Sequence, residues 1–329
     1  FGAVGDCVVT AVPYVAATHT EGKVSSYTGT IHEFSGTDDT AAFQRAYAAM
    51  DSGKTLYIPP GNYRINGNDA GWSSGTSWND KPGMVFDNKN NIVIKGDGES
   101  SKLCVAYNTT TGETVASNTF LLFQFKDSMK CSISRLSIDF QAVGWSPAQT
   151  ATPPSGSLDD ATKICGVLVA SSISTGSSDI TVDNCFLRVN HPFGSYFGEA
   201  YTANKYSTKL IATYFTGIYG TPTSLSTEPA ADAVMIKNCR VTNNTFYEGQ
   251  PYSVFLWMTD SVLIANNYFM ESGGLLPTIR GPHLNINTQI FGNYFRANRA
   301  WFNGSGASYC ILFFENAGWY IPEGVSIQG

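Results

Sequence analysis

The sequence predicts an all-β protein, a parallel β-helix (solenoid) with a short capping helix near its N-terminus. Most of the chain consists of short β-branched or aromatic runs broken by Asn, Gly and Ser. Within it an Asn-x-Phe unit recurs, ending at Phe186, Phe246, Phe269 and Phe295, and the last two intervals are 23 and 26 residues. Intervals of this size are typical of one repeat of a solenoid.

The repeat also predicts how the core is built. One coil cannot bury its inward side chains alone, but stacked coils form a continuous core. We therefore expect the asparagines of successive units to stack their amides and the phenylalanines to stack inside the solenoid.

One segment has helical spacing. In the stretch from Asp38 to Gly53, apolar residues recur every three or four positions. Asp38 or Asp39 can cap the first turn, and Gly53 is expected to end the helix. The segment 55–58 then predicts a strand, Pro59-Pro60-Gly61-Asn62 a turn, and the segment 63–65 a second strand.

These segments carry a family resemblance. The stretches Phe-Gly-Ala-Val-Gly-Asp (1–6), Gly-Thr-Asp-Asp-Thr-Ala-Ala-Phe-Gln-Arg-Ala (36–46) and Leu-Tyr-Ile-Pro-Pro-Gly-Asn-Tyr-Arg-Ile (56–65) resemble the N-terminal signature of pectate-lyase-like proteins. That group includes bacteriophage tailspikes, fungal glucanases and alginate epimerases. The resemblance covers about the first fifth of the chain. It implies a single-stranded right-handed parallel β-helix, and it does not imply one particular chemistry.

The chain departs from the family pattern at one place. Cys7 replaces a glycine, and the segment 7–35 interrupts a motif that usually runs on without a break. We therefore expect residues 1–65 to form an N-terminal cap with an inserted loop and the helix. Residues 66–329 then form the β-helix body with long loops at 68–81 and 144–160, and we expect this body to continue beyond residue 329.

Composition narrows the function classes. Charged residues make up only 14% of the chain, which is typical of β-rich extracellular proteins that bind sugars, and the net charge is −6. Nucleic acid is excluded as a partner because the sequence offers no basic stripe to neutralise phosphates. No apolar run reaches the length of about 20 residues that spans a bilayer, so membrane insertion is not expected.

The seven cysteines are scattered and include no Cys-x-x-Cys pair, so we expect no metal site and no cofactor. Most of them stand in apolar strand contexts, and we interpret them as small buried side chains of a protein made in a reducing cytoplasm. A few disulfides are the alternative.

The stacked repeats suggest a catalytic pair. Glu248 follows Phe246 by two residues and Glu271 follows Phe269 by two, so the two carboxylates are expected on adjacent rungs, roughly 4.7–4.9 Å apart. The same alignment puts Arg188 in this column further down the stack. Two close carboxylates raise the pKa of one of them, which suits a general acid beside a base or nucleophile. The alternative is a pair of exposed glutamates on a polar turn.

A second candidate pair follows two aromatic strands. Asp260 and Glu315 each come after such a run, and we expect them one rung apart. The alternative is a carboxylate that caps a turn. Candidate substrate-binding residues are two loop residues that could bind an acidic sugar or transfer a proton, and three rings that could stack on sugars: Arg280, His283, Trp257, Tyr252 and Trp301.

The calcium and arginine pattern of pectate lyases, the polygalacturonase set and the alginate epimerase Asp-Pro-His-Glu motif are not evident in the sequence. By exclusion, the resemblance implies a tailspike-like depolymerase, a glycoside hydrolase of bacterial capsule or O-antigen, that is a homotrimer on a phage tail or baseplate. Three alternatives stay open: a polysaccharide lyase of the same fold, a secreted glucanase and a non-catalytic receptor-binding spike.

Overall fold

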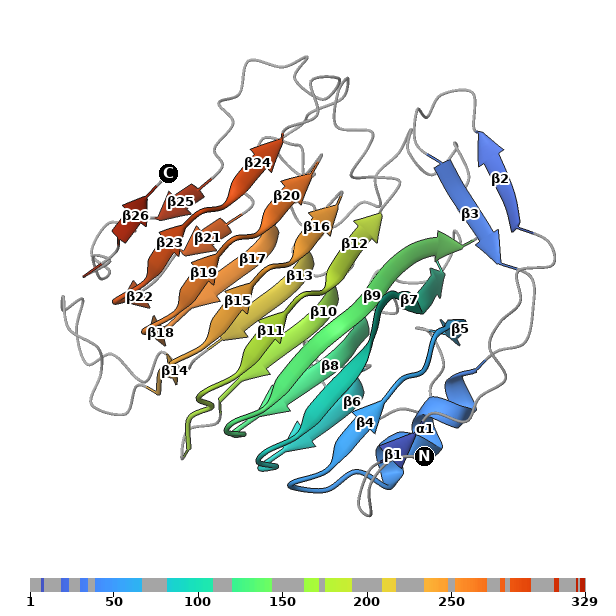
Figure 1. Ribbon diagram of the computed structural model, residues 1–329, viewed down its shortest axis with the longest axis horizontal. Coiled ribbons are helices and arrows are strands. Elements are labelled where there is room, and N and C mark those ends of the chain that lie inside the picture. Colours follow the sequence, from blue (N-terminus) through green and yellow to red (C-terminus); the bar gives the residue numbers. More distant parts are fainter. Residues whose placement is uncertain are drawn as a thin grey trace, which may run out of the picture.

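The protein is a single-stranded right-handed parallel β-helix with a short helix near its N-terminus, as the sequence predicted (Figure 1). The computed structural model covers residues 1–329 and describes 7–8, 19–23, 30–34, 39–66, 82–108, 120–143, 163–171, 175–190, 209–216, 234–247, 252–270, 279–281, 285–296, 311–313, 324 and 326–328. All pairs of described strands are parallel except one hairpin, β2 (His19–Lys23) with β3 (Thr30–Phe34).

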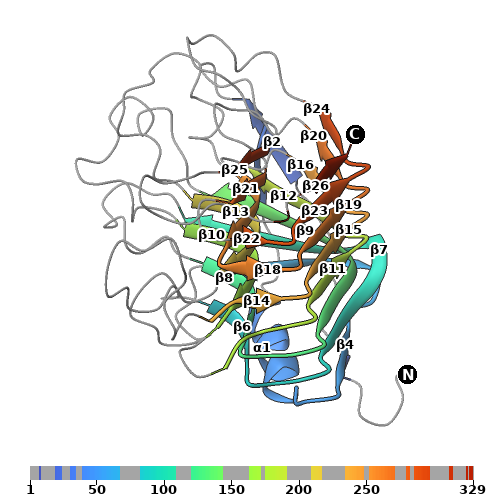
Figure 2. The ribbon, with the colours of Figure 1, turned by 90° about the vertical axis from the view of Figure 1, so that its left-hand side faces the viewer.

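The coils stack into three faces, seen end-on in Figure 2. Face 1 orders β4 (Thr55–Tyr57), β7 (Val93–Asn108), β9 (Ser132–Val143), β11 (Thr181–Asp183), β15 (Arg240–Thr242), β19 (Leu263–Ala265), β23 (Gln289–Phe291) and β26 (Ser326–Gln328), and β1 (Cys7–Val8) pairs with β4. Face 2 orders β5 (Gly61–Asn66), the second halves of β7 and β9, then β12 (Phe186–Asn190), β16 (Thr245–Tyr247), β20 (Tyr268–Met270) and β24 (Tyr294–Arg296).

Face 3 is a separate sheet. It orders β6 (Pro82–Asp87), β8 (Phe120–Lys126), β10 (Lys163–Ala170), β13 (Lys209–Thr216), β17 (Tyr252–Trp257), β21 (Ile279–Gly281) and β25 (Ile311–Phe313). A short ladder of β14 (Ile236–Lys237), β18 (Thr259–Asp260) and β22 (Asn285–Ile286) bridges face 3 to face 1. One coil therefore runs from face 3 through this ladder to face 1 and then face 2, as in β17–β18–β19–β20.

The helix α1 (Thr40–Ala48) lies at the end of the stack beside β4 and β5 (Figure 1). Asp39 is its N-cap, although the Asp39 side chain makes no capping hydrogen bond. The prediction that Gly53 ends the helix was wrong, because the helix stops at Ala48 and Gly53 forms a later turn with φ +79°. The division of the chain at residue 65 stays a prediction.

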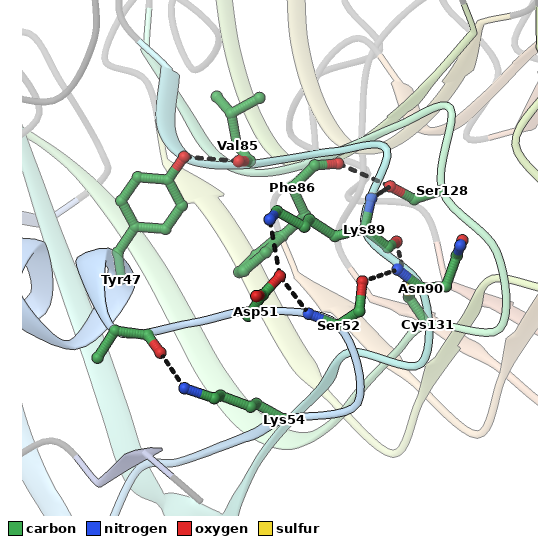
Figure 3. A network of polar contacts seen from close by, with 11 residues as sticks. Tyr47, Asp51, Ser52, Lys54, Val85, Phe86, Lys89, Asn90, Ser128 and Cys131 are labelled. Carbon is green, nitrogen blue, oxygen red and sulfur yellow. Dashed lines mark hydrogen bonds and ion pairs between the residues drawn. The ribbon is translucent and has the colours of Figure 1, made fainter. Parts of the chain in front are cut away.

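Polar contacts fix this end of the stack to the first coils (Figure 3). The Tyr47 hydroxyl donates to the Val85 carbonyl at 2.6 Å, and the Lys89 ammonium contacts the Asp51 carboxylate at 2.7 Å. The backbone N–H of Asn90 donates to the Ser52 hydroxyl oxygen at 3.0 Å. The first contact joins α1 to β6, and the other two join the turn after α1 to the turn that follows β6. The helix is therefore held in place by the solenoid as well as by its own apolar side.

The interior contains the stacks that the repeat predicted. Phe246, Phe269 and Phe295 lie on successive rungs, and their rings stack at centroid distances of 5.0 and 4.7 Å. Asn244, Asn267 and Asn293 form an amide ladder next to them. The intervals of 23 and 26 residues are therefore true coils.

The alignment of the unit at 183–186 was wrong by one residue. Leu187, not Phe186, pairs with Phe246, and the interior Asn244 is matched one coil earlier by Cys185, whose N–H donates to the Asn244 amide oxygen at 2.9 Å. Phe186 consequently points out of the solenoid, because neighbouring strand residues alternate between its two sides.

The turn between faces 1 and 2 has the same conformation in five successive coils. Arg135, Asn184, Asn243, Asn266 and Gly292 occupy it with φ between 49° and 61°. Asparagine and glycine tolerate this left-handed region better than other residues. The Asn-Asn and Gly-Asn pairs of the repeat therefore have two roles, since the first residue makes the turn and the second enters the ladder.

Four cysteines have described side chains, namely Cys104, Cys131, Cys185 and Cys239, and all four are buried and free. For these four the interpretation as small buried side chains is confirmed, and the disulfide alternative is wrong.

In the described part of the chain, no helix is long and apolar enough to cross a membrane.

Candidate functional site

The outer side of face 2 is the candidate site. We call it the aromatic surface and define it by the aromatic and basic residues among the outward positions of β12, β16, β20 and β24: Phe186, Arg188, Tyr247, Tyr268, Tyr294 and Arg296. Thr245 and Met270 occupy the two remaining outward positions in the columns that these residues form. The strand pairing aligns these side chains in two columns that run across the strands. Successive rungs are about 4.8 Å apart, so each column repeats at that spacing.

The first half of the aromatic surface is a stacked cluster. The rings of Phe186 and Tyr247 stack with centroids 6.3 Å apart, and the Arg188 guanidinium carbon lies 5.4 Å from the centre of the Tyr247 ring. A guanidinium over an aromatic face is a favourable cation–π contact. This part of the surface therefore presents a flat ring beside a fixed positive charge.

The second half is open to solvent. Tyr268 is 56% exposed and Tyr294 is 52% exposed, and their ring centroids lie 6.0 Å apart. Arg296, in the neighbouring column, is also exposed. Large rings exposed side by side are typical of binding surfaces, because burying them against a partner removes apolar area from water.

On the side of the earlier coils, the column of Arg188 continues with a buried residue. Asp139 of β9 is the register partner of Arg188 and is only 1% exposed, although it stands in an outward position. Its carboxylate lies 3.3 Å from the Lys102 ammonium. A buried carboxylate needs such a counter-charge, so Asp139 and Lys102 form a supporting base next to Arg188.

Sequence reasoning missed most of this surface. Only Arg188 was placed near the candidate site, and its column was wrong, because Arg188 pairs with Tyr247 rather than with the position of Glu248. The signal was present in the repeat. In the units that end at Phe246, Phe269 and Phe295 the Phe faces inward, so the residues directly before and after it face outward.

Glu248 and Glu271 lie outside the described residues. The residues that directly precede them, Tyr247 and Met270, are the last residues of β16 and β20 and are register partners. Both glutamates thus follow immediately, in sequence, from strands that build the aromatic surface.

Asp260 lies elsewhere, in the ladder strand β18. Its carboxylate accepts a hydrogen bond from the Ser261 hydroxyl at 2.9 Å and another from the Asn287 amide at 3.0 Å. Both donors belong to turns between the ladder and face 1, so in this geometry the carboxylate caps those turns.

Asp260 and Glu315 were expected one rung apart, but the strands that precede them, β17 and β25, are not neighbours in the sheet. Glu315 lies outside the described residues, but it follows β25, and β21 separates β25 from β17. The two strands that precede the candidate carboxylates are therefore two rungs apart instead of one.

Two of the predicted substrate-binding residues lie at opposite ends of β17. Tyr252 begins that strand, four residues after Glu248, and Trp257 ends it next to the ladder. With a rise of about 3.3 Å per residue along the strand, the backbone of Tyr252 lies roughly 16 Å from the backbone of Trp257. Trp257 is half-buried and stacks on Phe255 at 6.4 Å, so part of its ring is used in packing.

Arg280 is in β21 and pairs with Phe255 of β17. His283 and Trp301 lie outside the described residues. Among the residues that the structure describes, no group of three or more His, Cys, Asp or Glu side chains is arranged to hold a metal ion.

The sequence matches no protein-family model and no curated protein. Among solved structures, similarity is found to a protein from Parabacteroides merdae provisionally assigned as a glycosyl hydrolase, with a TM-score of 0.44, 13% identity, and coverage of 82% of this chain and 93% of that one. Another is PfbA, a surface adhesin of Streptococcus pneumoniae, with a TM-score of 0.39, 12% identity, and coverage of 84% and 73%.

Pectate lyase II of Xanthomonas campestris is also similar, with a TM-score of 0.36, 15% identity, and coverage of 89% of this chain and 78% of that one. These proteins differ in activity, and the identities and scores are low. The function of this chain therefore has to be argued from its own residues.

Proposed function

We propose that this protein is a carbohydrate-active enzyme, a tailspike-like depolymerase that hydrolyses glycosidic bonds of a bacterial capsule or O-antigen with Glu248 and Glu271. The observation that carries the proposal is the pairing of Tyr247 with Met270, the residues that directly precede the two glutamates, at the edge of an exposed aromatic surface. Exposed rings supply binding energy for the polymer, and paired carboxylates supply the chemistry.

In the proposed reaction one glutamic acid donates its proton to the glycosidic oxygen as the bond from that oxygen to the anomeric carbon breaks. The other glutamate acts on the anomeric carbon, either directly or through a water molecule that it deprotonates. Water supplies the new hydroxyl group on the anomeric carbon and the proton that restores the acid. Each cleavage therefore consumes one water molecule and leaves both carboxyl groups as they started.

The test is digestion of a panel of purified capsular polysaccharides and O-antigens, with products identified by mass spectrometry. Wild type is compared with Glu248→Gln and Glu271→Gln, and with Glu99→Gln, which changes an exposed glutamate of β7. We expect wild type and the control to release fragments that each contain one added water, and either active-site variant to lose at least a thousandfold in rate. Equal cutting by all four proteins would move the site elsewhere.

A second candidate is a non-catalytic receptor-binding spike, favoured by the exposed rings of Tyr268 and Tyr294. In that case the protein binds a polysaccharide in the same panel and releases no product. An unsaturated product that absorbs in the ultraviolet would instead indicate a lyase, for which Arg280 and His283 are the first residues to replace.

The tailspike proposal includes a homotrimer on a phage tail or baseplate that acts outside the host cell. Native mass spectrometry tests the assembly, and we expect three chains. A monomer would favour the secreted glucanase of the same fold.

A further inference from the structure

We infer that the hairpin of β2 and β3 docks on the outer side of face 2 and covers its first coils, at β7 and β9. The hairpin belongs to the segment 7–35, which interrupts the N-terminal signature in the sequence. The covered part of face 2 is thus a contact surface inside the molecule, and the hairpin is the segment that occupies it. This contact does not depend on the proposed catalysis, and it explains where the open part of the aromatic surface begins.

The hairpin meets the solenoid at β9. β2 and β3 form a two-stranded sheet of their own, and β3 contacts β9 (Figure 1). Both edges of β9 are already occupied by hydrogen-bonded neighbours, β7 on one side and β11 and β12 on the other. The inner side of β9 faces the core with Ile133 and Ile138. The outer side is therefore the side of β9 that is left for the hairpin.

The outward residues of the first coils are covered. Ser137 and Asp139 of β9 and Cys104 of β7 lie in the two outward columns of the aromatic surface. Their exposed fractions are only 3%, 1% and 2%. Tyr268 and Tyr294, in the same columns on β20 and β24, are 56% and 52% exposed. Outward side chains of a bare sheet stay in contact with water, so another part of the chain has to lie over β7 and β9.

Cys104 reports on this cover. Burial and the nearby Asp139 carboxylate raise the pKa of the Cys104 thiol to about 12, from the usual value of 9.0. Cys131, Cys185 and Cys239 are also buried, but they belong to the core inside the solenoid. Loss of the hairpin should therefore expose Cys104 to water and reagents and leave the other three thiols protected.

The hairpin should also open before the solenoid unfolds. A two-stranded hairpin is marginally stable by itself, whereas β9 is paired with parallel strands on both sides. Local opening of such a weakly attached element costs less free energy than global unfolding. The thiol under the hairpin should consequently become accessible under milder conditions than the thiols of the core.

The first experiment replaces residues 20–33 by a short glycine-serine linker in the full chain. Alkylation of each thiol by iodoacetamide at pH 8 is followed by peptide mapping, and Cys104→Ser identifies the Cys104 signal. We expect the rate at Cys104 to rise at least tenfold over wild type. The rates at Cys185 and Cys239 should stay within twofold, which makes these core thiols the matched control for an intact solenoid.

The second experiment needs no variant. Wild type is alkylated at increasing urea concentrations, and we expect Cys104 to react at a lower concentration than Cys185 and Cys239. This measurement decides alone if the shortened protein does not fold.

Two results would overturn the inference. One is a shortened protein in which Cys104 stays as protected as the core thiols, because a different segment would then cover β7 and β9. The other is wild type in which all these thiols become reactive at the same urea concentration, because the cover would then be part of the solenoid's own cooperative unit.

Discussion

Asn244 and Asn267 are joined twice across adjacent coils. The Asn267 amide oxygen accepts the side-chain amide of Asn244 at 3.0 Å and also the backbone N–H of Asn244 at 2.9 Å. The Asn267 amide nitrogen in turn donates to the Asn293 oxygen at 2.9 Å and to the Val241 carbonyl at 2.8 Å. Both Asn244 and Asn267 are completely buried. The ladder therefore satisfies buried backbone groups at the turn between two faces.

Asn267→Ala should be strongly destabilising. The substitution leaves buried donors of Asn244 without their acceptor, and each unsatisfied buried group costs about 1–3 kcal/mol. We expect the free energy of unfolding in urea to fall by roughly 3 kcal/mol. Gln289→Ala, which removes an exposed amide from β23, should change it by less than about 0.5 kcal/mol. Similar small losses in both variants would show that the ladder contributes little.

Phe269→Ala should be at least as costly. Its fully buried ring stacks between Phe246 and Phe295, so truncation opens a cavity in the middle of the stack. Truncating a buried Phe costs about 3–5 kcal/mol. Tyr268→Ala, at the adjacent exposed position, is the control, and thermal unfolding should separate the two variants clearly. If both shift the midpoint equally, the alternation of inward and outward residues in β20 is contradicted.

Gly292 provides a test of the turn. It has φ +61°, and a Cβ at this position would lie 2.5 Å from the Asn266 side-chain oxygen. Gly292→Ala should cost roughly 1–2 kcal/mol, because alanine tolerates the left-handed region poorly. Gly292→Asn should cost less, because asparagine already occupies the same turn in the preceding coils, at Asn184, Asn243 and Asn266. Chemical denaturation of the two variants checks the order, and the reverse order would refute this explanation of the turn.

The buried cysteines predict a loss of stability at high pH. Burial raises the pKa of the Cys185 and Cys239 thiols to about 12, from the usual value of 9.0. The unfolded chain loses these protons near pH 9 while the folded protein keeps them, so the stabilisation is complete below pH 9. It should then decline between pH 9 and pH 12, by up to roughly 1.4 kcal/mol per pH unit for each thiol.

Urea unfolding at several pH values measures this decline, with Cys239→Ala as the comparison, in which the slope should be shallower. Peptide mapping after brief alkylation at pH 8 gives an independent reading. Cys185 and Cys239 should be unmodified in the native protein and fully modified in urea. Rapid labelling of the native protein would show that these thiols are accessible.

Asp260→Asn separates the two candidate carboxylate sets. Because the Asp260 carboxylate accepts hydrogen bonds from Ser261 and Asn287, we expect a loss of about 1 kcal/mol in stability. The rate of polysaccharide cleavage should stay within twofold of wild type. A loss of cleavage with full stability would instead make Asp260 a catalytic residue, and the site would then lie at the ladder side of β17.

The sequence by itself determined the solenoid, its coil length and the stacked interior. Each coil buries its core only against the next, so inward Phe and Asn residues recur once per coil. The spacing of Phe246, Phe269 and Phe295 in the sequence therefore predicts the length of a coil. The helix was equally readable, since its apolar residues follow the helical period. The catalytic candidates Glu248 and Glu271 came from the same periodicity, and they remain predictions.

Only the tertiary structure decided which residues share a surface. A slip of one residue exchanges the two sides of a strand, and the insertion of unequal segments between strands hides how many coils separate two positions. For these reasons Arg188 lies in the column of Tyr247, whereas the sequence predicted it in the column of the two glutamates. For the same reasons β25, the strand before Glu315, lies two rungs from β17, whereas the sequence predicted one rung between Asp260 and Glu315. The aromatic surface exists because backbone hydrogen bonds between coils fix the register, and that register depends on contacts between residues far apart in the chain.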